Sequence, residues 1–88
     1  MYTGDPLTVT QAGELIKQAS PAMSIEIEIG CGNGHFLVAY GRYKSKSLLF
    51  GLDIKAKRCR KVKKKIKTQH LPHIEVICGR AESLLDYL

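Results

Sequence analysis

The residues best suited to chemistry form a glycine-rich segment, residues 28–34 (EIGCGNG), in a chain of 88 residues. The segment follows a stretch with the two-residue period of a β-strand and precedes a stretch typical of a helix. Its three glycines let the backbone turn sharply and approach a ligand closely, because no Cβ intervenes. These glycines are Gly30, Gly32 and Gly34. A glycine turn that binds nothing is the alternative, but this strand–turn–helix setting favours a bound nucleotide or nucleoside.

Two classes of cofactor use such a turn. A dinucleotide, whose pyrophosphate sits on the N-terminus of the next helix, needs a third glycine where this chain has His35. S-adenosylmethionine has no phosphate and carries an ammonium at its amino-acid end. The carboxylate of Glu28 suits that cation better than it suits a pyrophosphate. The segment therefore favours S-adenosylmethionine.

Asp53 ends a second apolar stretch, about twenty residues after the glycine segment. A carboxylate at this place can accept hydrogen bonds from both ribose hydroxyls of a nucleoside, with Ile54 offering an apolar surface to the adenine. Asp53 would equally suit the N-cap of the next helix. The interval from the glycine segment favours ribose binding. A third segment, residues 79–82 (GRAE), offers the backbone of Arg80 and Ala81 to the adenine.

Positive charge is concentrated in one segment. The formal net charge is +6, and nine of the fourteen basic residues lie between Lys55 and Lys67, with no acidic residue among them. We expect a helix that packs Cys59, Val62 and Ile66 inward. Since a single-sign helix repels itself, a merely solvated face is disfavoured. We expect salt-dependent contacts with RNA phosphates from Lys57, Arg58, Arg60, Lys61, Lys63, Lys64 and Lys65.

The elements that must position these residues alternate along the chain. The sequence predicts a helix opened by a capping box at residues 8–11, with Ala12, Leu15, Ile16 and Ala19 inward and a stop at residues 20–21. It further predicts strands over 24–29, 48–54 and 74–78, helices over 35–43 and 55–69, and the start of another helix over 83–88. This order indicates an α/β fold, the N-terminal βαβαβ half of a Rossmann-like doubly wound fold with parallel strands.

Composition and cysteine content narrow the class of protein. Hydrophobic residues make up 44% of the chain, which predicts a folded domain, and no apolar run is long enough to span a membrane. No signal peptide is visible, and Cys31, Cys59 and Cys78 form no C-x-x-C pair, so we expect reduced thiols in a cytoplasmic protein. Cys31 and His35 lie at helical spacing, but with no third ligand nearby we expect no metal site.

Residues 28–37 (EIGCGNGHFL) resemble motif I of the class I S-adenosylmethionine-dependent methyltransferases. Together with residues 51–59 (GLDIKAKRC), they resemble more narrowly the tRNA (guanine-N7)-methyltransferase family. The resemblance extends over residues 7–88 but reaches only the N-terminal half of that family's catalytic domain. It implies a Rossmann-like methyltransferase fold, S-adenosylmethionine as cofactor, and tRNA as the substrate methylated at N7 of a guanine.

The resemblance also implies roles for individual residues. Glu28 and the glycines of the loop would bind the methionine end of the cofactor, and Asp53 would bind the ribose. Arg80 and Ala81 lie where the family contacts adenine, but Arg80 replaces the usual Asp or Asn, which leaves a backbone contact at that position. The family's later Pro-Asp-Pro-Trp-like segment has no counterpart in this chain, so the resemblance assigns no catalytic residue.

The leading interpretation is therefore an incomplete methyltransferase domain over residues 1–88, with an N-terminal helix in 1–22 and the βαβαβ half in 23–88. We expect it to be inactive alone. The alternative is a non-catalytic RNA-binding module that uses the basic helix 55–67, and a nicotinamide-dependent oxidoreductase is disfavoured by His35. Both edges of the three-stranded sheet should be open. The rest of the domain or another chain would cover them, so the isolated chain should not melt cooperatively as a monomer.

Overall fold

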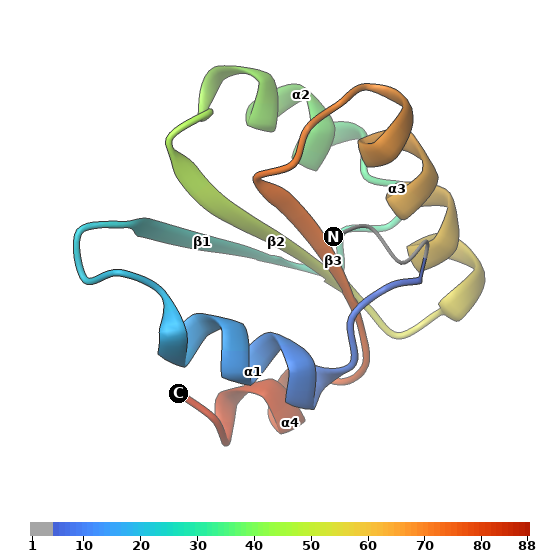
Figure 1. Ribbon diagram of the computed structural model, residues 1–88. Coiled ribbons are helices and arrows are strands. Elements are labelled where there is room, and N and C mark those ends of the chain that lie inside the picture. The colour runs from blue at the N-terminus through green and yellow to red at the C-terminus, as the bar shows by residue number, and fades with distance from the viewer. Residues whose placement is uncertain (1–4) are drawn as a thin grey trace.

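The computed structural model describes residues 5–88, and its elements follow the predicted alternation (Figure 1). The elements are α1 (Val9–Gln18), β1 (Ser24–Ile29), α2 (His35–Tyr43), β2 (Ser47–Asp53), α3 (Ala56–Thr68), β3 (Ile74–Cys78) and α4 (Ala81–Leu85). The strands form a parallel sheet in the order β1-β2-β3. This arrangement confirms the predicted βαβαβ half of a Rossmann-like methyltransferase fold.

Helices cover both faces of the sheet (Figure 1). The helices α2 and α3 lie on one face, and α1 and α4 lie on the other. The central strand β2 is buried on both sides: Leu49 belongs to the core under α2 and α3, and Phe50 to the core under α1 and α4. Because neighbouring side chains on a strand point to opposite faces, a strand covered on both sides must be apolar at nearly every position.

The edge strand β1 alternates apolar and acidic residues, unlike the nearly all-apolar β2, because its two faces have different surroundings. Ile25 and Ile27 pack into the core under α1 and α4. On the opposite face, the hydroxyl of Tyr40 in α2 donates a hydrogen bond to Glu26 Oε1 at 2.5 Å. The acidic positions of β1 therefore face α2 and are partly covered, while the apolar positions face the other layer.

The segment before α1 covers part of the β3 edge. Leu7 forms a parallel bridge with Ile77. Its N–H donates to the Val76 carbonyl at 2.8 Å, and its carbonyl accepts from the Cys78 N–H at 2.9 Å. The prediction that both sheet edges are open is therefore wrong for the part of the β3 edge that pairs with the extended backbone at Leu7. No strand of residues 5–88 pairs with the free edge of β1.

The helix α1 begins at the predicted capping box. Thr8 Oγ1 accepts the Gln11 N–H at 3.1 Å, and Gln11 Oε1 accepts the Thr8 N–H at 2.9 Å. The prediction that Leu15 faces inward is wrong, since that side chain is 39% exposed. The close contact is made at Gly13 instead, where an added Cβ would lie 2.6 Å from Tyr87 Cγ.

Candidate functional site

The glycine segment forms a tight loop between β1 and α2. Gly30, Gly32 and Gly34 have φ angles of 71°, 57° and 78°, in the left-handed region that favours glycine. The N–H groups of Gly30 and Cys31 donate to the Leu52 carbonyl at 2.7 and 3.0 Å, and the Gly34 N–H donates to the Cys31 carbonyl at 3.0 Å. The loop is thus held against the end of β2.

The three glycines differ in what surrounds them. Among residues 5–88, a Cβ added to Gly30 or Gly32 would meet no atom within 4 Å. A Cβ added to Gly34 would lie 2.9 Å from Val62 Cγ2. Gly34 therefore allows α3 to approach the loop, whereas Gly30 and Gly32 present open backbone that a ligand can approach.

Asp53 connects the loop to the start of α3. Its Oδ2 accepts the Gly32 N–H at 3.0 Å, and its Oδ1 accepts the Lys55 N–H at 3.0 Å. The Lys55 N–H is the main cause that lowers the pKa of Asp53; the Gly32 N–H and the Arg58 guanidinium lower it further, and burial opposes them. Each carboxylate oxygen has two lone pairs, so the ionised Asp53 can still accept hydrogen bonds from a ligand.

The alternative role of Asp53 as the N-cap of α3 is wrong. Lys55 occupies the N-cap position, and no side chain caps the helix. The Asp53 carboxylate binds the N–H of Lys55 itself, one step before the helix begins. Through its bonds to Gly32 and Lys55, Asp53 links the glycine loop to the connection between β2 and α3. No side chain caps the first turn of α3.

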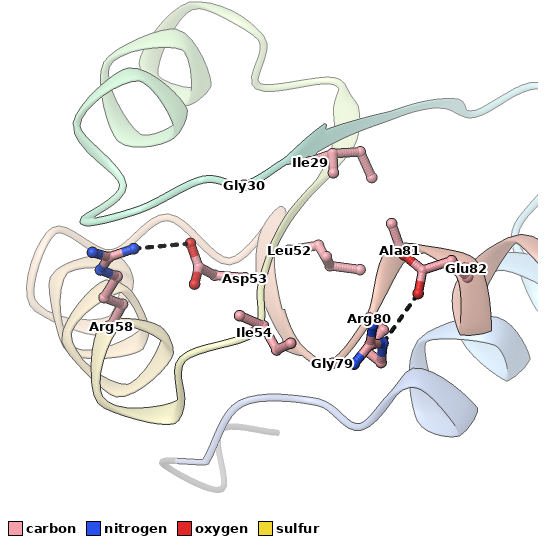
Figure 2. A pocket seen from close by; sticks show the side chains of 10 residues that line it. All are labelled: Ile29, Gly30, Leu52, Asp53, Ile54, Arg58, Gly79, Arg80, Ala81 and Glu82. Atoms are coloured by element: carbon pink, nitrogen blue, oxygen red, sulfur yellow. Dashed lines mark hydrogen bonds and ion pairs between the residues drawn. The ribbon is translucent and has the colours of Figure 1, made fainter.

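A cavity of about 300 Å³ opens at the carboxyl ends of all three strands (Figure 2). In open α/β sheets ligands bind outside these strand ends. The cavity brings together four of the residues predicted to bind a cofactor, Gly30, Asp53, Arg80 and Ala81, and Ile54 also lines it. Gly32 and Gly34 do not line it, although Gly32 is bonded to Asp53.

Two arginines border this cavity from different elements (Figure 2). Arg58, in the first turn of α3, has Nη1 4.0 Å from Asp53 Oδ2. Arg80 pairs with Glu82 at 3.1 Å, and both side chains are largely exposed. The sequence predicts Arg58 as an RNA contact, whereas the structure places it at the cavity. Its position in the turn directly after the β2 end was the signal available in the sequence.

Glu28 lies apart from this cavity. It lines a separate hollow of about 230 Å³ between β1 and α2, together with Phe36 and Tyr40. Its Oε1 atom is buried and has no hydrogen-bond partner among residues 5–88, and burial raises its pKa. Since an unpaired buried oxygen is unfavourable, this atom is a place where a donor from a ligand would be stabilised.

The basic residues of α3 do not all face solvent. Lys63 is only 4% exposed, and its Nζ lies 2.7 Å from the Glu75 carboxylate of β3. The prediction that Lys63 contacts RNA is therefore contradicted. The buried stripe of α3 is wider than expected, because position 63 lies one turn after Cys59 and one turn before Ile66, both fully buried. Lys65 is partly buried and donates to the Asn33 carbonyl at 2.8 Å.

The remaining cations of α3 form one exposed face. Their spacing of three or four residues places them along one side of the helix. The exposed residues of this face, which we call the basic face, are Lys57, Arg60, Lys61, Lys64 and Lys67. Four of them were predicted as RNA contacts, and Lys67 completes the row.

The cysteines of the described part of the chain are unpaired with one another. Cys31, Cys59 and Cys78 are free thiols, and burial is the main cause that raises the pKa of Cys31 to about 11. Within residues 5–88 no group of three or more potential metal ligands is present. No helix in this part of the chain has the length and apolar character needed to cross a membrane.

A family match and several solved structures relate the chain to methyltransferases. A family described as "Putative methyltransferase" matches residues 22–88. No curated protein sequence matches the chain significantly. Among solved structures, a "putative rRNA-methylase" from Clostridium thermocellum has a TM-score of 0.64 at 20% identity, over 93% of this chain and 47% of that chain.

Two further structures share the fold over shorter parts of their length. The StiE O-MT structure has a TM-score of 0.59 at 25% identity, over 81% of this chain and 25% of that chain. The plantazolicin methyltransferase BamL, solved with S-adenosylhomocysteine (SAH), has a TM-score of 0.58 at 22% identity, over 91% and 28%. The chain thus spans about half or less of the length of these structures. Because the family match extends over most of its residues, the chain belongs to this methyltransferase family, the family of the tRNA guanine-N7 methyltransferases.

Proposed function

We propose that the chain forms the S-adenosylmethionine-binding half of a methyltransferase that acts on N7 of a guanine in tRNA. The observation that carries this proposal is the cavity at the strand ends, where the ionised Asp53 carboxylate lies beside the open backbone of Gly30. Membership of the family supports methyl transfer and supports tRNA as the substrate class.

Residues of this chain offer groups for both ends of S-adenosylmethionine, which supports the proposal. Asp53 keeps lone pairs for the ribose hydroxyls, and Ile54, 59% exposed, offers an apolar surface beside the backbone of Arg80 and Ala81 for the adenine. The orphaned Oε1 atom of Glu28 is an acceptor for the ammonium of the methionine end. The backbone of Gly30 and Gly32, which follows Glu28 in the chain, is open to a ligand. The BamL structure, which was solved with SAH, supports the same cofactor.

The reaction requires alignment more than acid–base chemistry. Guanine N7 carries a lone pair and no proton, so no base has to act before the attack. When bound, S-adenosylmethionine supplies a sulfonium methyl group, whose bond to sulfur breaks as the N7–carbon bond forms and leaves its electron pair on sulfur. The residues of this chain bind and orient the donor, and proximity provides much of the rate enhancement. We place the groups that hold the guanine outside residues 1–88, beside the open edge of β1.

The basic face of α3 supports an RNA substrate. Its five exposed cations have no acidic residue between them in the helix, so they can neutralise successive phosphates without reading sequence. The cavity and the basic face meet at α3, because Arg58 reaches Asp53 from the same helix. The free cysteines fit a cytoplasmic location, which we also propose.

Calorimetry of the full-length protein with SAH tests the cofactor site. We expect saturable binding that Asp53→Asn weakens at least about tenfold, because a hydrogen bond to a charged acceptor is lost. An SAH analogue without the two ribose hydroxyls should bind the wild type as weakly as SAH binds Asp53→Asn. Combining the analogue with Asp53→Asn should cause little further loss of affinity, because both changes remove the same interaction. Asp86→Asn, an exposed carboxylate outside the cavity, is the matched control and should bind normally.

Two outcomes would contradict the proposal at different levels. Absence of SAH binding with tRNA affinity intact would favour the non-catalytic RNA-binding module. Methylation of tRNA at an atom other than guanine N7, detected by mass spectrometry of nucleosides, would contradict the target and leave the cofactor site in place.

A further inference from the structure

Lys65 connects the basic face of α3 to the glycine loop. Its Nζ donates a hydrogen bond to the carbonyl oxygen of Asn33 at 2.8 Å. Asn33 lies between Gly32, which Asp53 holds from the β2 side, and Gly34, which packs against Val62 of α3. The open stretch of loop therefore has one anchor on Asp53 and another on Lys65.

Lys65 also lines a hollow of about 330 Å³ on the surface of α3. Lys61, Lys64, Thr68 and Gln69 line the rest of it, and no acidic residue of the described chain does. Arg42 Nη2 donates to Gln69 Oε1, which leaves the amide nitrogen of Gln69 as a further donor. Three ammonium groups with hydroxyl and amide donors suit a phosphate, whose oxygens accept several hydrogen bonds and whose charge they neutralise.

The chemistry of the ammonium group allows both contacts at once. A lysine ammonium has three N–H donors, of which the Asn33 carbonyl uses one. A phosphate in the hollow can take another and would immobilise the Lys65 side chain against the loop. Because Lys65 donates to the Asn33 carbonyl in this conformation of the loop, a phosphate that fixes the Lys65 side chain would favour this conformation over others.

We propose that this hollow binds a backbone phosphate of the RNA and that Lys65 couples RNA binding to cofactor binding through the Asn33 carbonyl. Lys65 is a positioning residue, because it acts on the cofactor through the loop. RNA then raises the affinity for the cofactor, and the cofactor raises the affinity for RNA by the same factor. The inference rests on the proposed function, since it assumes that the loop binds the cofactor and the basic face binds RNA.

The test is calorimetric titration of SAH into the full-length protein with and without saturating tRNA. We expect tRNA to tighten SAH binding by about fivefold, and Lys65→Met to reduce this ratio to about one because the shared contact is lost. Lys61→Met is the matched control: Lys61 lines the same hollow and has no bond to the loop. It should weaken tRNA binding and keep the ratio once tRNA is saturating. Lys65→Arg, which retains donors, should recover part of the ratio.

The outcomes separate the coupling from the proposed function. If Lys65→Met keeps the wild-type ratio while both ligands bind, the coupling is overturned and the two sites stand. If the wild type binds no SAH or no tRNA, the proposed function fails first, and the coupling fails with it. Inorganic phosphate in place of tRNA should not tighten SAH binding; a full effect would identify a free anion as the ligand and overturn the assignment to RNA. Equal melting temperatures of the variants show that folding is not the cause.

Discussion

The Asp53 carboxylate accepts the Gly32 N–H at 3.0 Å, across 21 residues of sequence. The same side chain accepts the Lys55 N–H and lies beside Arg58, so the glycine loop, the end of β2 and the start of α3 meet at one carboxylate. A residue expected to contact the cofactor therefore also organises the site. Substitutions at Asp53 should change both the free energy of unfolding, which urea unfolding measures, and the affinity for SAH, which calorimetry measures.

Stability should depend on pH through Asp53. The folded state lowers its pKa below the ordinary 3.8, with the Lys55 N–H as the main cause. The stabilisation is therefore fully present above pH 3.8 and is lost as the pH falls through the lower folded-state pKa. We expect urea unfolding to show that Asp53→Asn lowers the free energy of unfolding at pH 7, and that the difference shrinks below pH 3.8. A difference that stays constant over this range would contradict the assignment.

Gly34→Ala should destabilise the protein more than Gly32→Ala. Both substitutions place an L side chain at a left-handed φ, which costs roughly 1–2 kcal/mol. Only the new Cβ at Gly34 meets Val62, at 2.9 Å, and overpacking adds about 1–3 kcal/mol. Urea unfolding measures both losses, and Val62→Ala should recover part of the loss in the Gly34→Ala background. Equal losses at the two glycines would show that α3 can move away from the loop.

Lys63 and Lys64 should separate stability from RNA binding. Lys63→Met removes the buried partner of Glu75, whose side chain stays 24% exposed, and should lower the free energy of unfolding by about 1–3 kcal/mol, with the salt dependence of tRNA binding unchanged. Lys64→Met should leave stability nearly unchanged and reduce the salt slope by about one unit. Adding Glu75→Gln to Lys63→Met should restore part of the stability. A shallower salt slope for Lys63→Met would contradict this prediction and show that Lys63 contacts RNA as the residues of the basic face do.

Arg58 should act on the cofactor site and Arg60 on RNA. Arg58→Ala removes a cation 4.0 Å from Asp53, and we expect SAH binding to weaken by about two- to fivefold because the pair is partly solvated. The salt slope of tRNA binding should not change. Arg60→Ala, two residues along the same helix, is the matched control and should give the reverse pattern. Identical effects of the two substitutions would mean that Arg58 shares the role of the basic face.

The buried thiols should resist alkylation. Burial is the main cause that raises the pKa of Cys31 to about 11 and of Cys59 to about 12, so little reactive thiolate exists at pH 8. Cys78 is only partly buried and should react with iodoacetamide first. Mass spectrometry of peptides after timed labelling gives the order. All three should react alike in urea, and equal early labelling under native conditions would contradict the burial.

The sequence predicts elements whose signals are local. The seam of Cys59, Val62 and Ile66 is fully buried as expected, because helical periodicity depends on neighbouring residues alone. The roles of Lys63 and Arg58 could not be predicted in this way. Their partners Glu75 and Asp53 come from strands, and which cations of a uniformly basic helix meet an acid is decided by how that helix packs on the sheet.

The helix ends show the same limit. Residues 83–88 were predicted to begin the last helix, whereas α4 starts at Ala81, directly after Arg80 in extended backbone conformation. The chain can turn into a helix this early because β3 ends at the cavity and the Gly79 N–H is bonded to the Asp53 carbonyl at 3.1 Å. Tertiary contacts of the preceding strand thus set where the helix begins.

The bridge at Leu7 determines which edge of the sheet can accept a further strand. Strand edges with unpaired backbone groups recruit other strands, and proteins often protect them with charged side chains. Here the middle of the β3 edge is protected by backbone bonds at Val76 and Cys78, while no strand of residues 5–88 pairs with the outer edge of β1. We therefore expect a strand that joins, from the same chain or from another molecule, to extend the sheet beyond β1. Removing surface charges would not change this difference between the two edges. Replacing Leu7 by proline, which lacks the N–H that binds Val76, would open the β3 edge to self-association.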